Sequence, residues 1–219
     1  MGRARDISKV FSTGTALATD TEVSGSYLTL ASASTTYQTK AAAGLTLITP
    51  TSISNTGGTA SIGTNGVVTL SGVTNISFNY VFSSIYKSYQ IILLTNTASG
   101  IYTYNLRLRT SSTATDKSTD YYWSGQYQKF DTTSEGGENG NNATSFQIGG
   151  IGPTRGSVNS TIHNPFESQE TNFSAIGHDG EYKRVYAGKL GVTTSYDGFT
   201  IFSGGSTLSG QVGIYGFNQ

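Results

Sequence analysis

The sequence predicts an all-β fold, and three observations support it. The chain contains 28 Gly, 14 Tyr and 10 Phe among many Ser, Thr and Asn residues, a composition typical of short strands joined by tight turns. Short apolar–polar alternations recur along residues 45–219. Cysteine is absent, so the fold cannot depend on disulfides or on a thiolate metal site. These patterns predict a β-sandwich or a barrel over residues 45–219, and of the two we expect a jelly-roll-like β-sandwich.

The charge balance narrows the range of partners. Thirteen basic residues match thirteen acidic ones, and only 12% of the chain is charged. A nucleic-acid partner is not expected, because phosphate binding needs an excess of Lys and Arg. No apolar run approaches the roughly 20 residues that a membrane-spanning helix needs, so membrane insertion is not expected. The basic N-terminus lacks the apolar core of a signal peptide, so we expect an unprocessed chain made in a cytoplasm.

Residues 1–44 differ in composition from the rest of the chain. Their apolar residues are isolated among small polar ones, and a weak internal repeat places Tyr27 and Tyr37 in matching positions. Such sparse apolar residues become buried when several chains bring them together, so we expect an extended segment that packs against copies of itself. A disordered Ser/Thr/Ala linker remains the alternative.

Strand signals then follow in order along residues 45–219. Residues 59–62 and 67–70 flank Gly63-Thr64-Asn65-Gly66, whose Asn-Gly pair suits a tight hairpin turn. The clearest half-buried strand is 102–109, in which Tyr and Leu alternate with Thr, Asn and Arg. About ten such strands would fit two packed sheets. The further predicted strands are 76–82, 90–95, 121–129, 145–148, 158–163, 173–176, 182–190, 199–202 and 211–215.

Composition also predicts loops and turns. Residues 110–119 and 131–142 (DTTSEGGENGNN) have the Gly, Asn, Asp and Ser content of exposed loops. The glycine-rich run 149–156 lacks the spacing of a dinucleotide-binding loop, so we interpret it as a turn. Recognition is expected mainly in the two loops, because a rigid sandwich usually places its binding residues there.

No recognisable catalytic pattern is present, and we expect a protein that is not an enzyme and has no cofactor or metal. The motifs of serine hydrolases, zinc proteases and nucleotide-binding loops are all missing. His163 and His178 each precede a turn and are expected to be structural residues at strand ends. Asp131, Glu135 and Glu138 offer oxygen ligands for calcium, but their spacing matches no calcium loop.

Aromatic residues in polar segments allow three interpretations: core packing, a subunit interface or ligand contact. Tyr and Trp offer a flat apolar face with a polar tip, which suits all three. The group comprises Tyr121, Tyr122, Trp123, Tyr127, Phe130, Tyr182 and Tyr186.

Three parts of the chain resemble virion proteins of tailed bacteriophages, in particular the short trimeric tail fibres of marine and cyanobacterial phages. The opening GRARDIS (residues 2–8) resembles the attachment end of such fibres. Residues 27–40 (YLTLASASTTYQTK) are similar to their trimeric shafts. Residues 81–89 (VFSSIYKSY), the strand ending LRLR (106–109) and the closing LSGQVGIYGF (208–217) resemble a C-terminal domain that recurs in phage structural proteins.

The resemblance implies a homotrimer in the virion, attached to other virion proteins by residues 1–44, with domain 45–219 facing a glycan or protein on the host surface. Avidity from three copies would then offset weak single contacts. A capsid decoration or head-fibre protein is the alternative, and a polysaccharide-degrading tailspike or a free-standing lectin is less favoured. The candidate residues are Arg3, Arg5, Ile7, Val10 and Phe11 for virion attachment, Val23, Tyr27, Leu28 and Tyr37 for the trimeric shaft, and Tyr122, Trp123 and Tyr127 for receptor contact.

Overall fold

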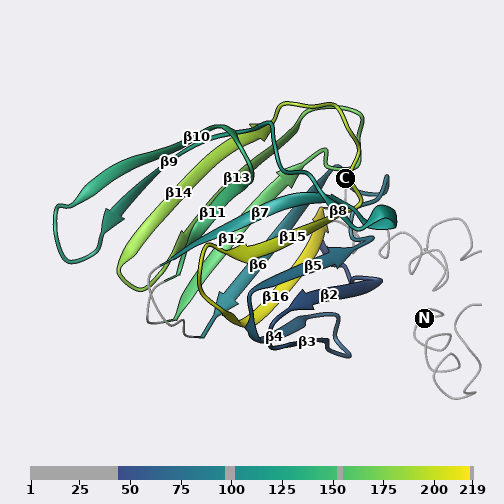
Figure 1. Cartoon of the computed structure of the whole chain (residues 1–219), viewed down its shortest axis with the longest axis horizontal. Helices are drawn as coiled ribbons and strands as arrows, with labels where there is room; N and C mark the ends of the chain where they lie inside the picture. Colours follow the sequence, from purple (N-terminus) through teal and green to yellow (C-terminus); the bar gives the residue numbers. More distant parts are fainter. Residues whose placement is uncertain (1–43, 97–101, 152–154, 218–219) are drawn as a thin grey trace, which may run out of the picture. The chain divides into compact units, whose positions relative to one another are not determined.

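A computed structural model describes residues 44–96, 102–151 and 155–217, which lie in one compact unit, Gly44–Gln219. The expected all-β sandwich is confirmed: every paired strand is antiparallel, and the strands form two sheets (Figure 1). No helix among the described residues is long and apolar enough to cross a bilayer. The predictions made for residues 1–43 concern a segment outside the described residues.

The larger sheet has ten strands and runs in Figure 1 from β10 at the upper left to β3 at the bottom. Nine strands form this path, and the tenth, the short strand β1, pairs with β16 beside it. In spatial order the strands are β10 (Glu135–Ala143), β9 (Tyr121–Lys129), β14 (Tyr182–Leu190), β13 (Thr171–His178), β12 (Gly156–His163), β6 (Ser88–Thr95), β16 (Leu208–Phe217), β4 (Val68–Val73) and β3 (Thr59–Ile62), with β1 at Leu45–Leu47.

The smaller sheet has six strands that run beside the larger one in Figure 1, from β11 to β2. A short 3-10 helix, η1 (Ser111–Thr113), and β8 (Thr115–Asp116) occupy the segment 110–119, so this predicted loop is partly regular. In spatial order the other strands are β11 (Phe146–Ile151), β7 (Tyr102–Thr110), β15 (Gly198–Ser203), β5 (Asn75–Asn79) and β2 (Ser52–Thr56), and β8 pairs with β7.

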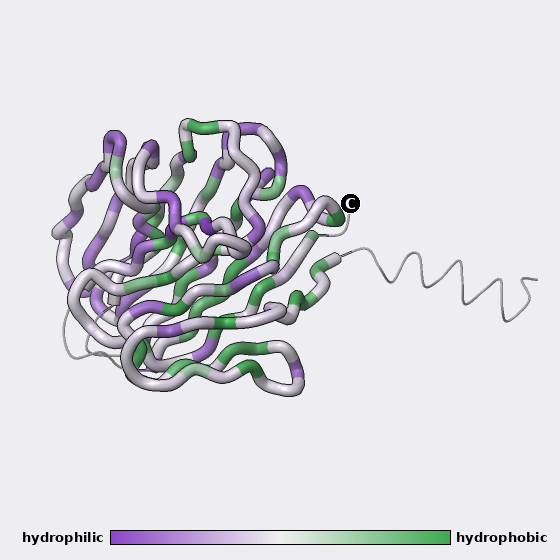
Figure 2. Tube along the Cα trace, turned by 45° about the vertical axis from the view of Figure 1, so that its right-hand side comes forward, coloured by the Kyte–Doolittle hydropathy of each residue, from purple (hydrophilic) through white to green (hydrophobic). Residues whose placement is uncertain are grey.

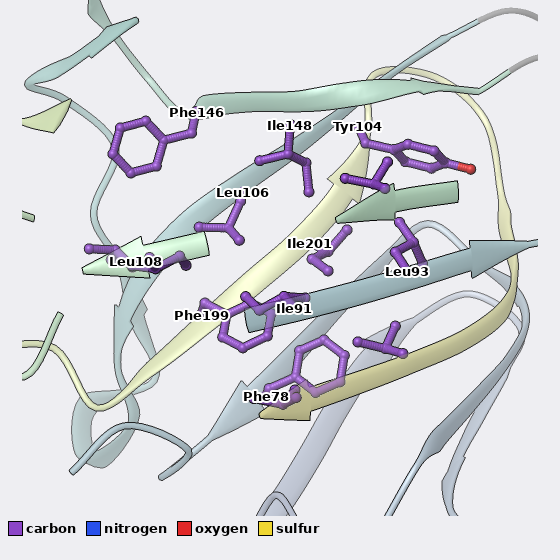
Figure 3. Packing of buried hydrophobic residues seen from close by; sticks show 14 of the residues in the cluster. Phe78, Ile91, Leu93, Tyr104, Leu106, Leu108, Phe146, Ile148, Phe199 and Ile201 are labelled. Atoms are coloured by element: carbon purple, nitrogen blue, oxygen red, sulfur yellow. The ribbon is translucent and has the colours of Figure 1, made fainter. Parts of the chain in front are cut away.

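The core lies between the two sheets and follows from the period-two pattern of the strands. Hydrophobic and hydrophilic positions alternate along single strands in Figure 2. Figure 3 shows the inward side chains of both sheets meeting, and the rings of Phe78 and Phe199 stack at 4.7 Å between centroids. Strand β7 confirms the predicted alternation, because Tyr104, Leu106 and Leu108 are all buried.

The predicted hairpin is also confirmed. Strands β3 and β4 pair in register, and the amide of Gly63 donates to the carbonyl of Val67 across the turn at 2.8 Å. Gly66 has a φ of +80°, the left-handed conformation that this turn requires. The predicted strand 76–82 is shorter than expected, since β5 stops at Asn79 and Tyr80 has a positive φ.

The interpretation of one glycine-rich segment was wrong, and that of another was wrong at its two ends, while residues 152–154 lie outside the described part of the chain. The predicted loop 131–142 is largely strand β10, which pairs with β9 from Glu135 to Ala143. The predicted turn 149–156 contains the end of β11 and the first residue of β12. The described residues hold sixteen strands, more than expected, partly because these segments and the short strands β1, β2 and β8 are paired.

Aromatic rings explain why a strand as rich in glycine as β10 forms. Gly136 lies opposite Tyr127 and Gly140 lies opposite Trp123 in the β9–β10 register. A Cβ atom at Gly136 would overlap the Tyr127 phenol, and one at Gly140 would overlap the Trp123 indole. The rings therefore cover the glycine backbone, which supplies packing that the glycines themselves lack.

We expect Gly140→Ala to lower the free energy of unfolding by about 1–3 kcal/mol, because its methyl group overpacks against Trp123. Gly137→Ala is the matched control, because its Cβ would lie 3.8 Å from the nearest atom, the carbonyl oxygen of Gly125. Urea unfolding followed by tryptophan fluorescence measures both. Equal stability of the two variants would contradict this packing.

Candidate functional site

The three strands β10, β9 and β14 form one end of the larger sheet, and their side chains alternate between its two faces. Gln126 and Gln128 of β9 are exposed, while Tyr127 between them is half-buried. We call the face that carries Gln126 and Gln128 the outer face and the face toward the smaller sheet the inner face. The sheet register places Glu135 and Lys183 on either side of Gln128 on the outer face.

The outer face of these strands is hollowed. Two hollows of about 460 and 520 Å³ lie there and share Gln126, Gly137 and Val185 in their linings. Small residues make the floor low, since Gly137 has no side chain and Val185 has Ala187 as its neighbour on the same face. We call the joined hollow the outer groove; its outward side chains come from Ser124, Gln126, Gln128, Glu135, Asn139, Lys183, Val185 and Ala187.

The outward-pointing amide side chains of the outer groove have no partners within the described part of the chain. The side-chain amides of Gln126, Gln128 and Asn139 form no hydrogen bond with another described residue. Some polar side chains elsewhere on the same face are paired, as Gln90 Nε2 donates to Asn159 Oδ1 at 2.9 Å. Each free amide can donate two hydrogen bonds and accept others, so the groove is suited to a ligand rich in hydroxyl groups.

The inner face beneath the groove alternates small and large residues in three cross-strand rows. Trp123 lies between two glycines, Gly140 and Gly188, and Tyr186 lies opposite Gly125. A Cβ at Gly125 would overlap the Tyr186 ring. The bulk of this part of the sheet is thus directed inward, which leaves the outer face shallow and open.

An ionic network on the inner face ties β14 to β10 across β9. Arg184 Nε donates to Asp179 Oδ2 at 3.0 Å, and its Nη1 donates to Glu138 Oε1 at 3.2 Å. Tyr186 donates its hydroxyl to Glu138 Oε2 at 3.0 Å, and Gln147 of β11 donates to the same carboxylate. Because Asp179 and Arg184 are buried, this network fixes the relative position of the strands that carry the groove.

Burial sets the ionisation of this network. Desolvation raises the pKa of Tyr186 to about 12, so its hydroxyl stays protonated and donates to Glu138 at neutral pH. Desolvation lowers the pKa of Arg184, but its hydrogen bonds to Tyr186 and Asp179 outweigh this effect and the pKa lies above its usual value. Both groups therefore hold one charge state across the physiological range.

The structure separates the three predicted receptor-contact residues. Tyr122 lies on the outer face at one end of the β9 row and is 38% exposed. Trp123 and Tyr127 point to the inner face, where Trp123 Nε1 donates to the carbonyl of Ser145 at 3.0 Å. The Tyr127 ring packs edge-on against Tyr182, with 5.7 Å between centroids. The three residues therefore do not form one surface, and their contact with a receptor stays a prediction.

Of the other sequence candidates, the histidines lie as expected at the ends of β12 and β13. Nδ1 of His163 and the hydroxyl of Ser88 are 2.8 Å apart. Among residues 44–96, 102–151 and 155–217 the structure brings together no group of three or more metal-ligating side chains. The attachment residues Arg3, Arg5, Ile7, Val10 and Phe11 and the shaft residues Val23, Tyr27, Leu28 and Tyr37 lie outside the described residues.

The sequence analysis did not predict the outer groove, because it placed the binding residues in the two predicted loops. Segment 131–142 does contribute to it, but through the strand residues Glu135, Gly137 and Asn139. The sequence did contain a signal for this surface. Residues 122–126 were predicted as part of a strand, so Tyr122, Ser124 and Gln126 should share one face of the sheet.

No protein-family model matches the chain, and no curated protein matches its sequence. Among solved structures, the chain is similar to a peanut lectin determined with a nine-residue peptide, at 8% identity and a TM-score of 0.33, covering 78% of this chain and 96% of that one. It is also similar to the galectin LEC-6 of Caenorhabditis elegans, at 9% identity and a TM-score of 0.33, covering 71% and 99%.

We expect Asp179→Ala to lower the free energy of unfolding by about 3–5 kcal/mol, because it leaves the buried Arg184 guanidinium with fewer partners. Glu170→Ala is the control, since its ion pair with Lys189 is exposed and should contribute less than about 1 kcal/mol. Thermal and urea unfolding measure both variants. A loss at Asp179 no larger than at Glu170 would show that the network does not hold these strands.

Proposed function

We propose that the sandwich binds a neutral glycan in the outer groove and that the chain is a homotrimeric virion fibre whose sandwich contacts the host surface. The observation that carries the binding proposal is the set of unpaired amides at Gln126, Gln128 and Asn139 around a low floor. The fibre role rests on the resemblance of residues 2–8, 27–40 and the domain segments to phage fibres.

The chemistry of the groove favours sugars over other ligands. Amide groups match hydroxyls because both donate and accept hydrogen bonds. Val185, which is 42% exposed, and Ala187 offer an apolar floor for the C–H face of a sugar ring. Lys183 and Glu135 flank Gln128 with opposite charges, so the end of the groove carries no net charge and favours a neutral ligand.

A weak single site agrees with the proposed trimer. The groove is open and shallow, and each hydrogen bond to a sugar contributes only about 0.5–1.5 kcal/mol net of water. Three grooves on one particle-bound trimer would raise the apparent affinity by avidity without any further contact. A receptor-binding role needs this property, because attachment must survive the loss of any one contact.

Binding of the purified full chain to an array of neutral and acidic glycans tests the groove. We expect neutral glycans to bind, and Gln126→Ala to weaken binding about tenfold. Gly137→Leu should abolish binding, because its side chain fills the floor. Gln211→Ala is the control, an exposed glutamine on the same face of β16 but outside the groove.

The groove proposal fails if the array shows no neutral glycan, or if Gln126→Ala and Gly137→Leu bind as the unchanged chain does. Circular dichroism of each variant separates loss of binding from loss of folding. If Gly137→Leu is unfolded, the comparison of Gln126→Ala with Gln211→Ala still decides the matter.

The fibre role has its own test. We expect the purified full chain to have the mass of a trimer in solution and removal of residues 1–44 to give a monomer. A monomeric full chain that is unchanged by the truncation would overturn the trimer. Antibody labelling of intact virions distinguishes the tail-fibre role from the alternative of capsid decoration: label on the tail supports the first, and label on the head supports the second.

A further inference from the structure

The outer groove is elongated along β9. Its two hollows are joined through Gln126, Gly137 and Val185, and their linings extend along β9 from Ser124 to Gln128. Over these positions the floor stays low. A ligand in the groove would therefore follow the strand direction, and on the β14 side it would pass Ala187, Val185 and, at the Gln128 end, Lys183.

Exposed aromatic rings stand at both ends of the same row. Tyr122 precedes Ser124 on the outer face and is 38% exposed. Phe130 follows Gln128, is 61% exposed, and its ring lies 6.4 Å from that of His178, which is an outer-face residue of β13. At about 3.4 Å per residue, Tyr122 and Phe130 are separated by roughly 27 Å along the strand.

From this row we propose that the outer groove takes the interior of a linear, unbranched neutral polysaccharide, with sugar rings stacked on Tyr122 and Phe130 and hydroxyls bound by the amides between them. This inference rests on the proposed glycan binding and specifies its substrate class. A span of roughly 27 Å exceeds the length of a single sugar ring several times over, so recognition of one terminal sugar would leave most of the row unused.

The positions of the polar, charged and aromatic side chains along the row agree with a linear polysaccharide. The amides of Gln126 and Gln128 lie in line between the two rings, so each successive sugar meets a hydrogen-bonding group. Lys183 and Glu135 stand on opposite sides of Gln128 and border the row at that position, where a branch would meet their side chains. Phe130 has no polar atom, so its exposed ring can contribute only by apolar contact.

Calorimetry with oligosaccharides of increasing length tests the inference. The probes are dextran, amylose, β-1,4-mannan and β-1,4-glucan, each as polymer and as defined oligomers, with the full chain in solution. We expect affinity to rise with oligomer length until the oligomer spans the row and then to level off. Phe130→Ala and Tyr122→Ala should each weaken binding of the long oligomers about three- to tenfold and leave the shortest binding oligomer unchanged.

Tyr80→Ala is the matched control, because Tyr80 is an exposed aromatic residue, 49% accessible, at the end of β5 in the other sheet. If the shortest oligomer binds as tightly as the polymer, or if the two end variants bind all lengths as the unchanged chain does, the linear-chain inference is overturned while glycan binding at Gln126 stands. If none of the four polymers and none of the arrayed glycans binds, both proposals fail.

Discussion

The packing of aromatic rings on glycines in β10, β9 and β14 is the constraint on which this end of the larger sheet depends. Trp123 covers Gly140, Tyr127 covers Gly136 and Tyr186 covers Gly125, all on the inner face. Because the bulk is inward, the outer face has the small residues Gly137, Val185 and Ala187 beside the β9 row. A sheet that places its large side chains on one face and small residues on the other can thus form a binding surface on the face with the small residues.

The ionic network contributes more to the relative position of the strands than to the free energy of folding. Replacing a buried ion pair with apolar residues of similar volume is often neutral or stabilising, whereas removing one partner is costly. Arg184 reaches both Asp179 in the β13–β14 turn and Glu138 on the edge strand, so it links elements that backbone hydrogen bonds alone would join only through β9. The carboxylates and the guanidinium set the separation of the walls of the outer groove.

The sequence predicted the sandwich well where side chains determine the strands. The alternation in 102–109 identified β7, because Tyr104, Leu106 and Leu108 face the core. The prediction from sequence failed at residues 131–142, since strand formation there depends on aromatic rings contributed by β9 and not on local propensity. The choice of Tyr122 together with Trp123 could have been corrected from sequence, because adjacent strand residues face opposite ways. The low floor at Gly137 could not, because it depends on the register of β10 and β14 with β9, which places Gly137 and Val185 on either side of Gln126.

Glu138 has a consequence for solubility as well as for geometry. Strand β10 is the edge of the ten-stranded sheet, and its Gly- and Asn-rich backbone has little bulk to keep another chain from pairing with it. Charged residues that point inward from an edge strand oppose such pairing, because a stacked neighbour would have to bury the charge. By holding a carboxylate on the inner side of this edge, the Arg184 network also protects a protein with no net charge from edge-to-edge aggregation.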